Sequence, residues 1–155
     1  MSALHALRRA RRGTAALEFA LLTPLLLAFL GGVTDFGLVT IARSQLANAV
    51  AQGAQYAILT GTDVSPTTIK TLVQKASPLN NLTATVTPAA GAACYCISGS
   101  PLALVSATCT ATCPDGTAPG EYLTISATYT YNPIMPFYSK MASTTLTEKA
   151  QVRIQ

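Results

Sequence analysis

The chain has 155 residues, of which half are apolar and only 10% are charged, and its formal net charge is +4 at pH 7. Four arginines within residues 1–13 account for this excess, because six basic and six acidic residues remain without them. Nucleic-acid binding rests on clustered positive charge, so the composition argues against a nucleic-acid partner. Beside a leader and a membrane segment, the length leaves room for one small domain of roughly 100 to 120 residues.

The N-terminus joins a basic head to a long apolar run. The arginines stop before Gly13, and the run extends from Thr14 to Val33 with few interruptions. Residues 14–34 have about the length that spans a bilayer. The basic head predicts that residues 1–13 form a leader held in the cytoplasm, with the C-terminal part outside the inner membrane. No small-x-small site follows the run convincingly, which disfavours cleavage by the general signal peptidase.

Two residues inside the apolar run are unusual. A carboxylate near the start of a membrane helix is expensive to bury, so Glu18 is a functional candidate by default. Pro24 lacks an N–H and is expected to kink the helix or to loosen one of its turns.

Helical periodicity continues through residues 35–60. A stripe of mostly small residues recurs at three- and four-residue spacing, and the polar residues lie mostly off it. We therefore expect one helix from the membrane segment to Thr60, closed by Gly61. The alternative is a separate anchor that breaks from this helix at Gly31-Gly32. The stripe consists of Val39, Ala42, Leu46, Ala49, Val50, Gly53 and Ala57.

Residues 61–155 predict a short second helix followed by a sheet. Ser65-Pro66 is a helix start and Ser77-Pro78 an end. From Leu82 the apolar period becomes two, which is typical of antiparallel strands with one wet face. The fold class is therefore α+β, a small head behind a long N-terminal helix. The inward residues are Ala84, Val86, Leu123, Ile125, Ala127, Tyr129, Tyr131, Leu146, Ala150, Val152 and Ile154, whereas Tyr122 falls on the wet face.

Glu148 is an exception, because it falls on the apolar face of the last strand. Either a partly buried carboxylate or a shifted register explains it.

Four cysteines lie in the Pro-, Gly-, Ser- and Thr-rich segment 88–120, at Cys94, Cys96, Cys109 and Cys113. An exported chain favours disulfides, and neither pair has the two-residue gap of a usual zinc knuckle. Free thiols are the remaining alternative. Of three pairings, the one that joins near neighbours needs a strained tight ring. The nested pairing, Cys96–Cys109 inside Cys94–Cys113, suits a hairpin and is favoured over the crossed one.

Catalytic patterns are not found in the sequence. The single histidine, His5, lies in the leader, so no histidine is available outside the membrane to activate a serine or cysteine. The exported acids are scattered, Asp115-Gly116 is more simply a turn, and no phosphate loop or dinucleotide fingerprint is present. We expect a protein without enzymatic activity, cofactor or metal.

The N-terminal half carries a set of short motifs. They are Arg11-Arg12-Gly13, Ala16-Leu17-Glu18-Phe19-Ala20, Pro24 among leucines, Asp35-Phe36-Gly37 and Gly53-Ala54-Gln55-Tyr56-Ala57. With them, residues 8–59 resemble the TadE-like family, minor pilins (pseudopilins) of the tight-adherence (Tad) pilus, a branch of the type IV filaments. The C-terminal half is similar in style, at Cys113-Pro114-Asp115-Gly116 and Tyr129-Thr130-Tyr131-Asn132-Pro133.

The resemblance implies a processing site and a set of partners. A prepilin peptidase is expected to cut between Gly13 and Thr14, Phe19 fits the position after the glutamate, and Glu18 would meet the new amine of a neighbouring subunit. The partners implied are this peptidase, other pilins or pseudopilins, the Tad assembly machinery and the lipid bilayer.

Three functional classes follow. The favoured one is a minor pilin that serves assembly of an adhesive pilus, since major pilins of such systems are much shorter chains. The alternatives are a single-pass membrane-anchored extracytoplasmic binding domain that never enters a filament, and an exported enzyme or toxin with a signal anchor.

Overall fold

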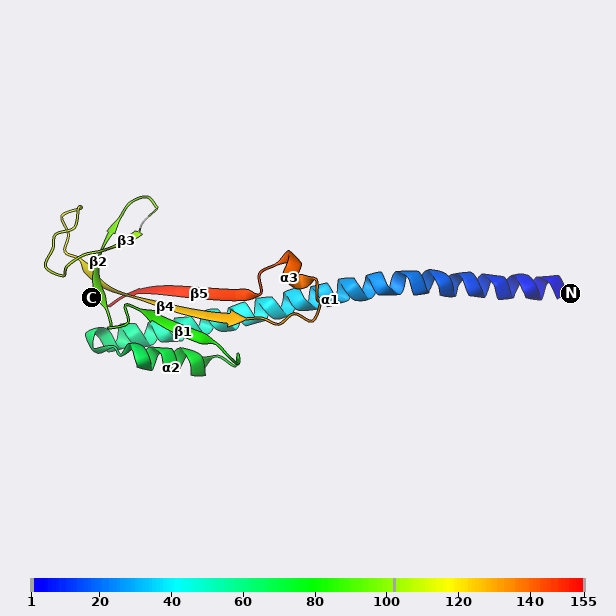
Figure 1. The fold of residues 1–155 in the computed structure, drawn as a ribbon, viewed down its shortest axis with the longest axis horizontal. Coiled ribbons are helices and arrows are strands. Elements are labelled where there is room, and N and C mark those ends of the chain that lie inside the picture. Colours follow the sequence, from blue (N-terminus) through cyan, green and yellow to red (C-terminus); the bar gives the residue numbers. More distant parts are fainter. Residues whose placement is uncertain (1, 102, 155) are drawn as a thin grey trace. The chain divides into compact units, whose positions relative to one another are not determined.

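The computed structural model describes residues 2–101 and 103–154, with side chains from residue 14 onward. The fold is α+β, as the sequence predicts (Figure 1). Its elements are the helix α1 (Ser2–Thr60), the 3-10 turn η1 (Gly61–Asp63), α2 (Pro66–Ala76), β1 (Thr83–Thr87), β2 (Ala93–Ser98), β3 (Ala103–Ser106), β4 (Gly120–Thr130), α3 (Tyr138–Met141) and β5 (Thr145–Arg153).

The chain forms two compact units. The first contains α1 up to Val39 together with Asn132–Ser143, a segment that we call the 132–143 connection. The second contains Thr40–Tyr131 and the last strand, β5.

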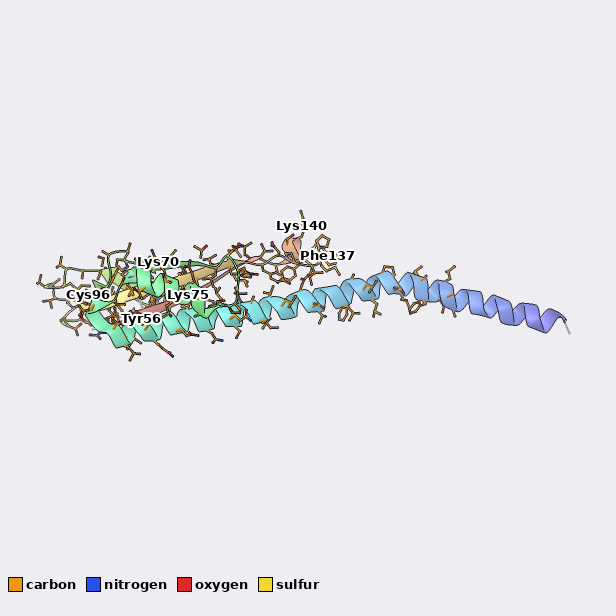
Figure 2. The ribbon with its side chains drawn as sticks, turned by 90° about the horizontal axis from the view of Figure 1, so that it is seen from below. Tyr56, Lys70, Lys75, Cys96, Phe137 and Lys140 are labelled. Atoms are coloured by element: carbon orange, nitrogen blue, oxygen red, sulfur yellow. A yellow bond between two sulfur atoms is a disulfide. The ribbon has the colours of Figure 1, made fainter. Side chains whose placement is uncertain are left out.

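The helix α1 is continuous, so the prediction of one long helix is confirmed and a break at Gly31-Gly32 is wrong. It passes through Pro24 without ending, and Figure 2 shows it bending within its N-terminal half. It ends at Thr60 as expected, because Gly61 adopts a positive φ of 66° that favours glycine.

The core of the second unit is built on the small-residue stripe of α1. The stripe residues from Ala42 to Ala57 are buried within the chain itself. Gly53 permits the closest approach, because a Cβ at this position would lie 2.6 Å from a methyl of Val73 on α2 and 3.7 Å from Ile125 on β4. A small side chain at this point lets both helices and the sheet share one core.

The strand β4 is the centre of an antiparallel sheet. β5 pairs with it over residues 122–130, while β1 pairs with residues 124–128 and β2 with residues 120–122. Since a strand has two edges, β1 and β2 follow one another along the edge opposite β5, and β3 pairs with β2. Figure 1 shows β4 between β1 and β5.

The predicted alternation holds in β1 and β4 but fails at one residue. Tyr122 was assigned to the wet face, yet it is buried. Its ring packs edge-on against Tyr95, with centroids 6.4 Å apart, and the Arg153 guanidinium lies 6.0 Å from its centroid. These neighbours from β2 and β5 cover what would otherwise be an exposed aromatic ring.

The partly buried carboxylate is the correct explanation for Glu148. The register places Glu148 opposite Ala127, so the regular alternation of β5 continues through this residue without a shift. Its Oε1 lies 3.4 Å from Nε of Arg43 on α1, and its side chain is 31% exposed. The ion pair offsets part of the cost of placing a carboxylate on the inner face.

The four cysteines form two disulfides, as predicted, but the favoured nested pairing is wrong. The bonds are crossed, Cys94–Cys109 and Cys96–Cys113. The register of the β2–β3 hairpin explains this, because Val105 lies opposite Cys96 and the N–H of Ala107 donates to the carbonyl of Cys94. Cys109 therefore leaves the hairpin beside Cys94, and the chain turns back to bring Cys113 to Cys96.

We predict that double variants distinguish the two pairings. Cys94→Ser/Cys109→Ser removes one complete bond and leaves Cys96–Cys113, so alkylation without reductant should label no thiol. The matched control, Cys94→Ser/Cys113→Ser, leaves two cysteines that are not partners, so it should be labelled twice and should lose more stability. Mass spectrometry of the alkylated chains provides the measurement. Two protected thiols in the control, with labelled thiols in the first variant, would restore the nested pairing.

Candidate functional site

The first unit presents a helix surface that is apolar on every side. Between Leu17 and Phe36 the large apolar side chains of α1 are each more than half exposed. A helix that is apolar all round belongs in a membrane or among other helices, not in water. By length and composition α1 is suited to cross a membrane, consistent with a single-pass membrane protein. These side chains are Leu17, Phe19, Leu21, Leu22, Leu25, Leu26, Leu27, Phe29, Leu30, Val33 and Phe36.

The polar side chains within this surface differ in whether they have a partner within α1. The Thr23 hydroxyl donates to the carbonyl of Phe19 at 2.7 Å, and the Thr34 hydroxyl donates to that of Leu30 at 2.9 Å. Such bonds within the helix satisfy hydroxyl groups without water. Among the described side chains, those from residue 14 onward, none forms an ion pair with Glu18.

The processing and assembly residues of the prediction lie together at the start of the described surface. Thr14, Glu18 and Phe19 are exposed on α1. Residues four apart share a helix face, so Thr14 and Glu18 are one turn apart on the same side. Gly13 lies within α1, but its surroundings are outside the described side chains. The roles of these residues stay predictions.

Asp35 is a functional candidate that the sequence analysis quoted only as part of a motif. Its side chain is fully buried. Oδ1 accepts the N–H of Ile134 and Oδ2 accepts the N–H of Met135, each at 2.9 Å. Hydrogen bonds to an ionised acceptor are about twice as strong as neutral ones. Asp35 therefore clamps the 132–143 connection onto α1.

The clamp is supported by a close approach one turn away along α1. A Cβ at Gly31 would overlap the side chain of Met135, so a larger residue at this position would require the flexible Met135 side chain to move. An apolar hollow of about 450 Å³ remains between α1 and the connection, with Phe29, Phe36 and Phe137 among its lining residues. Both walls of the hollow consist mainly of apolar side chains.

The second unit has a hollow of about 420 Å³ beside the disulfides, lined partly by Tyr95, Asp115 and Arg153. The hydroxyl of Thr117 and then its N–H donate to Asp115 Oδ1, at 2.8 and 3.0 Å, and these bonds lower the pKa of Asp115. As predicted, Asp115 is a turn residue, since Gly116 follows it with a φ of 80°.

One group of potential metal ligands lies nearby, formed by Cys94, Cys109 and Glu121. The two sulfur atoms are joined in a disulfide, so neither is the thiolate that binds metal.

We predict that Asp35→Ala releases the 132–143 connection without unfolding the second unit. The change leaves two buried N–H groups without their acceptor, at a cost of about 1–3 kcal/mol each. At the lower limit the two groups together cost about 2 kcal/mol, which corresponds to a roughly 30-fold change in the opening equilibrium. Hydrogen exchange at Ile134 and Met135 should accelerate accordingly. Asp63→Ala, at an exposed acid, is the control. Unchanged exchange in Asp35→Ala would contradict the clamp.

Comparison with known proteins bears on α1 alone. No curated protein and no solved structure matches the chain at a significant level. A family model described as "TadE-like protein" matches residues 13–55, which contain Glu18, Asp35 and most of the small-residue stripe. The resemblance inferred from the N-terminal motifs is confirmed over this segment. Residues 13–55 are thus similar to the TadE-like family, and the match does not extend to the rest of the chain.

Proposed function

We propose that the chain is a minor pilin, or pseudopilin, of a Tad-type pilus, matured by a prepilin peptidase and serving pilus assembly for surface attachment. Its role is structural and not catalytic. The observation that carries the proposal is the exposed carboxylate of Glu18 within an apolar helix surface that matches the TadE-like model.

The exposed surface of α1 supports two successive environments. Before assembly, residues 14–34 are held in the inner membrane with the arginine-rich leader in the cytoplasm and the head outside. During assembly, the same side chains exchange lipid for the helices of other pilin subunits. Either environment removes this apolar area from water, so a subunit can transfer between them without exposing it.

Glu18 distinguishes an assembly subunit from a simple anchor. A membrane anchor gains nothing from a carboxylate, which costs free energy in lipid. In a filament, cleavage after Gly13 would create an amine at Thr14, and the amine of one subunit would pair with Glu18 of its neighbour. Removing one partner of a buried ion pair is strongly destabilising, so the pair would also fix the axial register of the subunits.

We predict that the mature chain begins at Thr14. Gly13→Ala should be tolerated because the residue stays small, whereas Gly13→Leu should block cleavage and leave the leader attached. N-terminal sequencing of protein extracted from membranes measures this directly. A mature chain that starts at Met1, or beyond Leu30, would exclude processing by a prepilin peptidase.

We predict that Glu18→Ala inserts into the membrane at least as well as the natural chain but supports less piliation. Insertion improves because a costly charge is removed, and assembly suffers because the amine has lost its partner. Membrane fractionation and counting of surface pili separate the two effects.

Thr23→Ala is the matched control for this experiment. It removes another polar group from the same helix surface, but the hydroxyl of Thr23 is satisfied within α1. Piliation should therefore be unchanged. Normal pili on cells whose only change is Glu18→Ala would refute the pairing and favour the membrane-anchored binding domain.

A further inference from the structure

The 132–143 connection combines exposed apolar side chains with a backbone that is partly hydrogen-bonded within the first unit. Ile134 is 63% exposed, Phe137 45% and Met141 82%, although they lie within a few residues of each other. Tyr138 is buried within the first unit. Figure 2 labels Lys140 on α3 and Phe137, the residue that precedes this helix. In water, such a cluster on a loop would be unfavourable.

Part of the backbone of the connection is hydrogen-bonded within the first unit. The clamp at Asp35 accepts two of its N–H groups, and two of its residues are prolines, which have none. Further N–H groups donate to carbonyls within the connection, those of Tyr138 to Met135, of Lys140 to Phe137 and of Ala142 to Tyr138. Irregular backbone tolerates hydrocarbon surroundings only where its polar groups are satisfied in this way.

The clamp at Asp35 also avoids unpaired polar groups beside lipid. Burying an unpaired carboxylate or an unpaired N–H beside lipid costs several kcal/mol, by order of magnitude. Asp35 follows directly after the apolar segment 14–34, where water becomes scarce. The hydrogen bonds from the N–H groups of Ile134 and Met135 to the Asp35 carboxylate satisfy the donors and the acceptor together.

The contact with Gly31 sets the depth of the connection. Gly31 lies three residues before the end of the apolar segment, and the rise of an α-helix is about 1.5 Å per residue. Met135, which packs on Gly31, is therefore level with a point roughly 5 Å inside that end. If residues 14–34 fill the hydrocarbon core, the connection lies at its outer boundary and not above it.

We propose that the 132–143 connection is an interfacial membrane anchor. Ile134, Phe137 and Met141 enter the acyl region of the outer leaflet beside α1, and the exposed Lys140 reaches the phosphate of a phospholipid headgroup. Apolar side chains next to a lysine are the chemistry of segments that lie in a membrane interface. The apolar hollow between α1 and the connection is then filled by acyl chains.

The inference rests on the proposed function in one respect, that residues 14–34 span a membrane. It adds a second attachment, which must leave the lipid when the subunit leaves the membrane.

Tryptophan fluorescence tests the anchor, because the chain contains no tryptophan. Phe137→Trp places a single reporter in the connection of the full chain, reconstituted in phosphatidylcholine/phosphatidylglycerol vesicles with brominated acyl chains. Ile97→Trp on β2 is the matched control, since Ile97 is 44% exposed and Phe137 45%. Phe29→Trp reports insertion of the apolar segment itself. Should Phe137→Trp fail to fold, Met141→Trp replaces it.

We expect brominated lipid to quench Phe29→Trp and Phe137→Trp and to leave Ile97→Trp unchanged. Quenching at Phe29 without quenching at Phe137, with iodide reaching Phe137, would overturn the anchor and leave the span intact. Protection of Phe137 from both quenchers would overturn it in favour of a second protein copy. Equal quenching at Ile97 would exclude a specific anchor. No quenching at Phe29 would refute the span, and the anchor with it.

Discussion

An apolar helix surface cannot remain in water, and α1 imposes this constraint on the rest of the chain. The large side chains between Leu17 and Phe36 are exposed, so their cover must come from outside the chain. Lipid and neighbouring helices are the two kinds of cover that fit a surface of this chemistry. A membrane-stored subunit that later enters a filament uses both, and this is the basis of the proposed function.

The two halves of α1 differ in the size of their side chains and in whether the chain itself covers them. In the second unit, small residues such as Ala49, Gly53 and Ala57 let α2 and β4 approach closely, and the helix is covered from within. In the first unit, leucine and phenylalanine enlarge the surface and leave it open. The difference in side-chain volume along one continuous helix separates the part that the chain itself covers from the part that stays exposed.

The two acids in the apolar part of α1 show the same division. Asp35 finds both of its partners within the chain, in the backbone of the 132–143 connection, so its burial stabilises the first unit. Glu18 has no ion-pair partner among the side chains from residue 14 onward. A carboxylate that is satisfied internally stabilises the fold, whereas the exposed Glu18 is the residue for which we propose a partner in a neighbouring subunit.

The sequence by itself determined the elements whose signals are local. The stripe from Ala42 to Ala57, the end of α1 before Gly61 and the alternation in β1, β4 and β5 follow from periodicity and turn chemistry, and the N-terminal motifs identified the TadE-like segment. Only the tertiary structure decided the features that depend on residues far apart. The hairpin register places Val105 opposite Cys96, so the chain has to turn back beyond the hairpin before Cys113 can bond to Cys96. Asp35 accepts hydrogen bonds from N–H groups that lie 99 and 100 residues further along the chain. Periodicity specifies which face a residue occupies, but only the packed chain specifies which partner it meets there.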